Sequence, residues 1–197
     1  MKRWFDLLIE WRYPADETFH LARHRGTVGW DHADVRAYFE SKHRIAAALR
    51  PRRIVEIGVR CGYSAFAMLW AVPKASYLGI DNRDPAYGDS ATFARHAAGL
   101  LSVFPDVTFR NVDTRELVDL PGPVPDLVHV DGDHSFEGAQ HDIDLALRSG
   151  ARWVLIDDTD YLEPVRRAAE VAAEGRLVFD LREPLRGAML IYNGGVG

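Results

Sequence analysis

The sequence predicts an α/β fold in which a mostly parallel sheet carries helices on both faces. From Arg53 onward, short runs rich in β-branched residues alternate with helical patterns, which is typical of consecutive βαβ units. The chain has 197 residues, enough for one sizeable core but too few for two full domains. We therefore expect one folded domain over residues 51–197, preceded by an N-terminal helical extension, residues 1–50.

The extension is rich in aromatic and basic residues, and residues 31–50 have the pattern of a helix. It precedes the first core strand, so two roles fit it. It covers a face of the sheet as packing, which is the more frequent outcome, or it lies across the open edge of a site as a lid.

Seven segments have the length and composition of strands. They are residues 54–58, 76–81, 107–113, 126–131, 152–158, 176–182 and 187–193. Only four residues, which include the stretch EPL, separate the last two, too little for a right-handed crossover. We therefore expect these two strands to pair as an antiparallel hairpin.

The clearest helix follows the fourth strand, in the stretch SFEGAQHDIDLALRSG. Ser135 is a plausible N-cap, and Gly150 is a natural terminator. The apolar residues between them recur at helical spacing and predict one buried face. They are Phe136, Ala139, Ile143 and Leu147.

Composition excludes several classes of protein. No apolar run approaches the roughly 18–20 residues that span a bilayer, and the N-terminal apolar run is too short for a signal peptide. A formal net charge of −5 disfavours a nucleic-acid partner. Cys61 is the only cysteine, which rules out an internal disulfide and fits a reducing compartment. We expect a cytoplasmic protein.

The segment VEIGVRCGYSAF runs from a strand through a glycine turn into a helix. Gly58 and Gly62 allow a sharp reversal and close approach of a ligand to the backbone. The spacing matches neither the dinucleotide fingerprint nor a P-loop. The helix that starts near Ser64 suits a carboxylate or a hydroxyl, and Asp81 ends the next strand, where such folds bind ribose. Together these features favour nucleoside binding over a tight turn without a ligand.

Acidic residues end two further strands, Asp131 one of them and Asp157 and Asp158 the other. If the two strands are neighbours about 4.8 Å apart, the three carboxylates meet and repel one another unless a cation joins them. Oxygen ligands of this kind favour Mg²⁺, with manganese or calcium as alternatives. The alternative is that Asp157 and Asp158 only cap a helix.

These motifs, in this order, resemble those of class I S-adenosylmethionine (SAM)-dependent methyltransferases, and more narrowly the metal-dependent O-methyltransferases of the catechol and natural-product sugar types. They are EIGVRCGYS, the strand ends at Asp81 and Asp113, VDGDHSFEG and LIDD. The resemblance covers roughly residues 50–193. It implies a Rossmann-like, doubly wound seven-stranded sheet in the order 3-2-1-4-5-7-6 with the last strand antiparallel.

The resemblance also implies cofactor contacts. Glu56 and Gly58 would border the methionine part of SAM, and Gly62 would allow close approach. Ser64 would bind the methionine carboxylate. The remaining contacts would lie further along the chain, with the ribose at Asp81, the adenine at Asp113 or its neighbour Thr114, and Asp131 next to both cofactor and metal.

Two residues compete as the base that removes a proton from the acceptor. His134 stands where the catechol type has a lysine, and Asp133 where the sugar type has an aspartate. Histidine titrates near neutrality, whereas an aspartate beside Mg²⁺ is a weaker base. Each also has an ordinary structural interpretation, Asp133 in a turn and His134 on the surface.

The sequence thus predicts a SAM- and Mg²⁺-dependent O-methyltransferase for a small hydroxylated acceptor of natural-product or sugar type. Two alternatives stay open. One is metal-independent methylation of nitrogen, carbon or a carboxylate, and the other is a nucleoside-binding scaffold without turnover. The expected partner is a small molecule; neither a membrane nor a nucleic acid is expected, and a homo-oligomer is compatible with the sequence.

Overall fold

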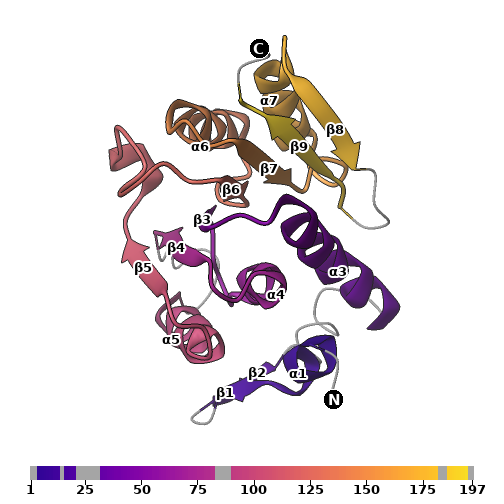
Figure 1. The fold of residues 1–197 in the computed structure, drawn as a ribbon, viewed down its shortest axis with the longest axis vertical. Coiled ribbons are helices and arrows are strands. Elements are labelled where there is room, and N and C mark those ends of the chain that lie inside the picture. Colours follow the sequence, from indigo (N-terminus) through magenta and orange to yellow (C-terminus); the bar gives the residue numbers. More distant parts are fainter. Residues whose placement is uncertain (1–3, 14–15, 21–31, 83–89, 182–185, 195–197) are drawn as a thin grey trace.

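The computed structural model describes residues 4–13, 16–20, 32–82, 90–181 and 186–194. Its centre is a seven-stranded sheet in the order β5-β4-β3-β6-β7-β9-β8 (Figure 1). Counted along the chain from β3, this order is 3-2-1-4-5-7-6, which confirms the prediction. The strands are β3 (Arg53–Ile57), β4 (Ser76–Asp81), β5 (Val107–Asn111), β6 (Leu127–Val130), β7 (Trp153–Asp157), β8 (Leu177–Leu181) and β9 (Ala188–Tyr192).

Strands β3, β4, β5, β6 and β7 are parallel to one another, whereas β9 pairs antiparallel with both β7 and β8. The predicted C-terminal hairpin is therefore confirmed. Most strands end a residue earlier than the sequence suggests. The largest difference is in β5, which ends at Asn111 because Asp113 instead caps a short 3₁₀ helix, η2 (Thr114–Glu116).

Helices cover both faces of the sheet (Figure 1). On one face, α3, α4 and α5 share a hydrophobic cluster with alternate residues of the strands, and α6 and α7 pack on the opposite face. These helices are α3 (His32–Leu49), α4 (Tyr63–Ala71), α5 (Ser90–Leu101), α6 (Phe136–Arg148) and α7 (Glu163–Ala173). The two apolar layers explain why the central strands are buried along their whole length.

Helix α6 begins and ends as predicted. Ser135 is its N-cap, and the Ser135 side chain accepts a hydrogen bond from the backbone N–H of Gly138 at 3.1 Å. Ala139 and Ile143 are buried against the sheet. Gly150 follows the helix with a φ of 76°, a left-handed conformation that favours glycine.

The N-terminal extension contains more than the predicted helix. A short helix, α1 (Trp4–Glu10), and a two-stranded antiparallel sheet of β1 (Arg12–Tyr13) and β2 (Asp16–His20) precede α3. Phe5 and Leu8 of α1 belong to the same hydrophobic cluster as α3 and α4. The extension therefore packs on the core, and α3 lies against α4 across the same face (Figure 1).

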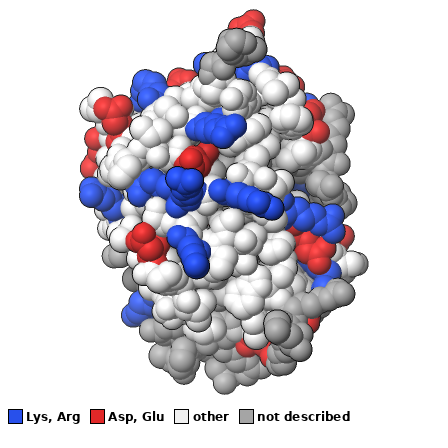
Figure 2. All heavy atoms as spheres, in the orientation of Figure 1, with Lys and Arg blue, Asp and Glu red and all other residues white. Residues whose placement is uncertain are grey.

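Within the described residues, no helix combines the length and the apolar character that a membrane span requires. On the face drawn in Figure 2, basic side chains gather in a band across the middle, with a few acidic side chains beside it.

Candidate active site

The loop between β3 and α4 brings backbone to the carboxyl ends of the strands. Gly58 and Gly62 have φ angles of 84° and 77°, in the region that favours glycine. A Cβ atom on Gly58 would lie 1.9 Å from the carbonyl oxygen of Asp131, so no larger residue fits where the loop passes the end of β6. Both predicted glycines are thus required by the turn itself.

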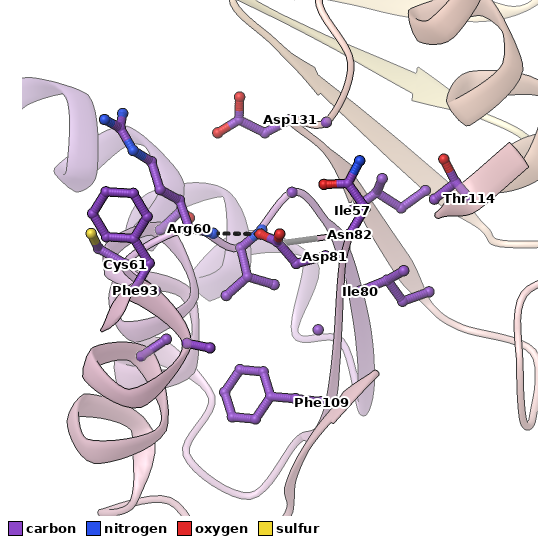
Figure 3. Close-up of a pocket in the computed structure, with 18 of the residues that line it drawn as sticks. Ile57, Arg60, Cys61, Ile80, Asp81, Asn82, Phe93, Phe109, Thr114 and Asp131 are labelled. Atoms are coloured by element: carbon purple, nitrogen blue, oxygen red, sulfur yellow. Dashed lines mark hydrogen bonds between the residues drawn. The ribbon is translucent and has the colours of Figure 1, made fainter. Parts of the chain in front are cut away.

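Asp81, at the end of β4, fastens this loop. Its Oδ2 accepts hydrogen bonds from the backbone N–H groups of Val59 at 3.0 Å and Arg60 at 2.9 Å (Figure 3). The strand end and the glycine loop are therefore held as one unit. The Asp81 carboxylate also borders the cavity described next.

A cavity of about 720 Å³ lies over the carboxyl ends of β3, β4, β5 and β6 (Figure 3). This volume lies within the range of roughly 300–1,000 Å³ that is usual for small-molecule sites. Nine residues predicted as site residues line it: Gly58, Gly62, Ser64, Asp81, Asp113, Thr114, Asp131, Asp133 and His134. Residues far apart in the sequence therefore meet at one place.

Glu56 does not line the cavity but is fully buried beneath it. It accepts hydrogen bonds from the hydroxyls of Ser64, at 2.5 Å, and of Tyr77, and lies 2.8 Å from Nδ1 of His129. The Ser64 hydroxyl is thus used inside the protein. Burial and the nearby Glu56 carboxylate raise the pKa of Tyr77 well above its usual value, so Tyr77 remains a donor.

Asp157 is also fully buried, and protein donors approach both of its carboxylate oxygens. The ammonium of Lys42 lies 2.6 Å from Oδ1, and the hydroxyl of Tyr38 donates to Oδ2. Nε2 of His129 lies 3.5 Å from the same Oδ2. Burial alone would raise the pKa of Asp157, but Lys42 and His129 hold it far below its usual value.

His129 bridges Glu56 and Asp157, and both partners stabilise its charged form. Burial opposes that form, yet the two carboxylates raise the pKa of His129 to about 10. It therefore carries a positive charge at neutral pH. This explains how two buried carboxylates coexist on β3 and β7, the two strands that flank β6.

A second group lies nearer the cavity. Nε2 of His134 is 3.7 Å from Oδ1 of Asp131 and 3.6 Å from Oδ2 of Asp158, and Arg186 contacts both oxygens of Asp158 at 3.1 and 2.9 Å. Burial and then the carboxylates of Asp131 and Asp157 raise the pKa of Asp158 to about 7, even though Arg186 and His134 oppose this. Negative charge in this group is therefore incompletely balanced.

Asp133 and Asp113 both serve local structure. Oδ1 of Asp133 accepts a hydrogen bond from the backbone of Ser135 at 2.8 Å, at the start of α6. Asp113 caps η2, and its hydrogen bonds with Arg115 lower the pKa of Asp113. The contacts of Asp133 are therefore those of a residue that stabilises a turn. Both aspartates also border the cavity.

The residues fit a divalent cation only in part. Potential ligand atoms of Asp131, His134 and Asp158 all lie within 4.8 Å of one another, and the raised pKa of Asp158 shows that this group would gain from a cation. Asp157 is different, because two separate buried groups, the Lys42 ammonium and the Tyr38 hydroxyl, occupy its two oxygens, whereas a single nitrogen of the partly exposed Arg186 faces both oxygens of Asp158. The three aspartates converge as predicted, but they are not equivalent.

Three residues that contact the acidic groups were not predicted from the sequence: Lys42, Tyr38 and Arg186. One signal for Lys42 was present. Val35, Phe39, Lys42 and Ala46 are all buried and follow a 4-3-4 spacing, so the lysine lies on the apolar stripe of its own helix. A charge on such a stripe indicates a buried partner. No comparable signal marks Tyr38 or Arg186.

Comparison with known proteins agrees with this geometry. The chain matches a family model described as a methyltransferase domain over residues 55–159, which is 105 of the 197 residues. No curated protein matches the sequence.

Among solved structures, an O-methyltransferase from Streptomyces achromogenes, TomG, in complex with SAM is 21% identical, with 98% of this chain and 95% of that chain covered and a TM-score of 0.59. The Podospora anserina methyltransferase PaMTH1, bound to S-adenosylhomocysteine (SAH), is 19% identical, with 98% and 88% covered and a TM-score of 0.62. An O-methyltransferase from Bacillus cereus in complex with SAH is 15% identical, with 87% and 88% covered and a TM-score of 0.61.

At these identities the solved structures establish a shared fold, and the family model covers more than half of the chain. The sheet has the strand order described above, and the glycine loop and the acidic strand ends line the cavity at the carboxyl ends of its strands. Open α/β sheets bind their ligands at this edge. The chain belongs to the methyltransferase domain family.

Proposed function

We propose that this chain is a SAM-dependent O-methyltransferase that methylates a hydroxyl group of a small acceptor. The observation that carries the proposal is the single cavity that joins the glycine loop and Asp81 to Asp131 and His134. The similar structures from S. achromogenes, P. anserina and B. cereus hold SAM or SAH, which supports the same cofactor here.

The cofactor would occupy the side of the cavity formed by the glycine loop. Gly58 and Gly62 present backbone there without a side chain, and the Asp81 carboxylate would accept hydrogen bonds from the ribose hydroxyls. Asp113 and Thr114 border the part proposed for the adenine. Glu56 would act from below, because it accepts a hydrogen bond at 2.5 Å from the hydroxyl of Ser64, which lines the cavity.

Bound SAM supplies an electrophilic methyl group on a positively charged sulfur. The acceptor hydroxyl must lose its proton, and we propose that His134 takes it. His134 lines the cavity, 3.7 Å from Asp131, and an imidazole is the side chain whose ordinary pKa lies nearest neutrality. Asp133 is the weaker candidate, because its carboxylate already accepts a hydrogen bond at the start of α6.

We further propose that Asp131 and Asp158 hold a divalent cation, most simply Mg²⁺. Two carboxylates at one edge of the cavity match the ligands that Mg²⁺ prefers, and one or two carboxylates suffice for it. A divalent ion at this position would lower the pKa of an acceptor hydroxyl. Arg186 would remain beside Asp158 and balance part of its charge.

The acceptor is proposed to be a small natural-product or sugar-like molecule. TomG, which has a similar fold, takes part in tomaymycin synthesis. Buried Cys61 fits a reducing compartment, so we propose that the protein acts in the cytoplasm. We also propose that residues 1–50 form part of the acceptor site, because Val35, Tyr38 and Phe39 of α3 line the cavity.

The test is a turnover assay with SAM and a panel of phenols, sugars and hydroxylated polyketides, with product analysis by mass spectrometry. We expect O-methylated product and SAH, loss of activity with EDTA, and recovery with Mg²⁺. O-methylation that resists EDTA would refute the metal part alone. Products methylated only at nitrogen, carbon or a carboxylate would refute the choice of acceptor, and SAH binding without product from any acceptor would favour a scaffold.

A further inference from the structure

Lys42 is a buried ammonium group at the centre of the acidic residues. Its side chain is 2% exposed, and its Nζ lies 2.6 Å from Oδ1 of Asp157, whose side chain is 0% exposed. The same ammonium lies 4.5 Å from the centre of the Tyr38 ring. A charged lysine is almost never buried without a partner, so this contact is specific.

The position that Lys42 fills otherwise resembles a cation site. Potential ligand atoms of His129, Asp131 and Asp157 lie within 4.8 Å of one another, just as those of Asp131, His134 and Asp158 do. The two groups share Asp131. They differ in the cation beside the second aspartate: the ammonium of Lys42 lies 2.6 Å from Asp157 and its side chain is 2% exposed, whereas the guanidinium of Arg186 lies 2.9 Å from Asp158 and its side chain is 21% exposed.

The remaining contacts of Asp157 complete its environment. Tyr38 donates to Oδ2, and Nε2 of His129 lies 3.5 Å from the same atom. His129 in turn lies 2.8 Å from Glu56. A chain of buried polar groups therefore runs from α3 through β7 and β6 to β3, beneath the cavity.

We propose that Lys42 takes the place of a divalent cation at Asp157. Asp157 is then a positioning residue that fixes α3, and with it Tyr38, against the cavity, rather than a metal ligand. A divalent ion is confined to Asp131 and Asp158. The assignment of the ion to these two residues rests on the proposed function, whereas the pairing of Lys42 with Asp157 does not.

The test is titration of the purified, SAH-saturated chain with Mn²⁺. Binding is measured by calorimetry or from the electron paramagnetic resonance signal of free Mn²⁺. Four variants are compared with the parent: Lys42→Met, Asp157→Asn, Asp158→Asn and the exposed control Lys74→Met. Circular dichroism confirms that each variant is folded.

In the parent chain we expect one Mn²⁺ site. Asp158→Asn should weaken it by more than about tenfold, because a carboxylate ligand is lost, while Asp157→Asn should change it by less than about threefold. Lys42→Met should tighten Mn²⁺ binding by about tenfold or more, because it removes a positive charge and frees a carboxylate. Lys74→Met should change nothing.

Two results would overturn the proposal: Asp157→Asn weakens Mn²⁺ binding as much as Asp158→Asn does, or Lys42→Met binds Mn²⁺ no more tightly than the parent. If the parent binds no Mn²⁺ but Lys42→Met does, the role of Lys42 stands and the metal part of the proposed function fails. The double variant Lys42→Met, Asp157→Asn removes both charges and should lose the gain. If it retains the gain, Asp157 is not the carboxylate that Lys42 blocks.

Discussion

Replacing Asp81 by alanine should weaken cofactor binding, and the structure allows the size of the effect to be worked out. Its Oδ2 holds the glycine loop through the backbone N–H groups of Val59 and Arg60, at 3.0 and 2.9 Å. The same carboxylate is proposed to accept hydrogen bonds from two ribose hydroxyls. Alanine removes both functions, whereas asparagine keeps an oxygen that the loop N–H groups can use.

A hydrogen bond to a charged group contributes about 1.5–3 kcal/mol, so two to the ribose give an upper limit of about 3–6 kcal/mol. Because the cavity is open to water, we expect about half of this, about 1.5–3 kcal/mol, or a rise of about 10- to 150-fold in the Kd for SAH. Asp81→Asn should raise the Kd by about tenfold, because the loop stays anchored while the charge is lost.

Isothermal titration calorimetry with SAH measures these values, and circular dichroism checks the fold. Asp119→Asn is a matched control, since Asp119 is exposed and does not line the cavity. If folded Asp81→Ala binds SAH within about threefold of the parent chain, the ribose role of Asp81 is refuted.

Three further predictions concern other residues. Lys42→Met should lower the free energy of unfolding by about 3–5 kcal/mol in urea titration, because it strands the buried charge of Asp157; a loss below about 1 kcal/mol would contradict the buried ion pair. His134→Gln should lower kcat by about 10²- to 10⁴-fold with the Kd for SAH unchanged, and an unchanged kcat would exclude it as the base. Burial raises the pKa of Cys61 to about 12, so iodoacetamide should alkylate it at pH 8 at least about 100-fold more slowly than it alkylates glutathione, and faster as pH rises; a comparable rate at pH 8 would refute the burial.

The sequence was sufficient for the sheet because its signals are local. The runs of β-branched residues lie where all seven strands form, and the short EPL stretch alone indicated the antiparallel ending. The strand ends were less accurate. Asp113 could extend β5 or cap a turn, and only the backbone of Arg115, which it binds at 2.9 Å, decides between them.

The partners of the acidic residues could not be predicted, because they come from distant parts of the chain. Lys42 and Asp157 are 115 residues apart, and Arg186 and Asp158 are 28 apart. The strand order brings the carboxylates of Asp131, Asp157 and Asp158 together, and the sequence indicated this convergence. Which of them is already neutralised depends on how α3 packs on the sheet, and that is a property of the tertiary structure.

Whether the cavity beside the glycine loop binds SAM can be measured by titration of the purified chain with SAH. We expect saturable binding of one SAH per chain, which SAM displaces. Absence of binding by the folded protein at millimolar SAH, or binding that SAM does not displace, would contradict this expectation.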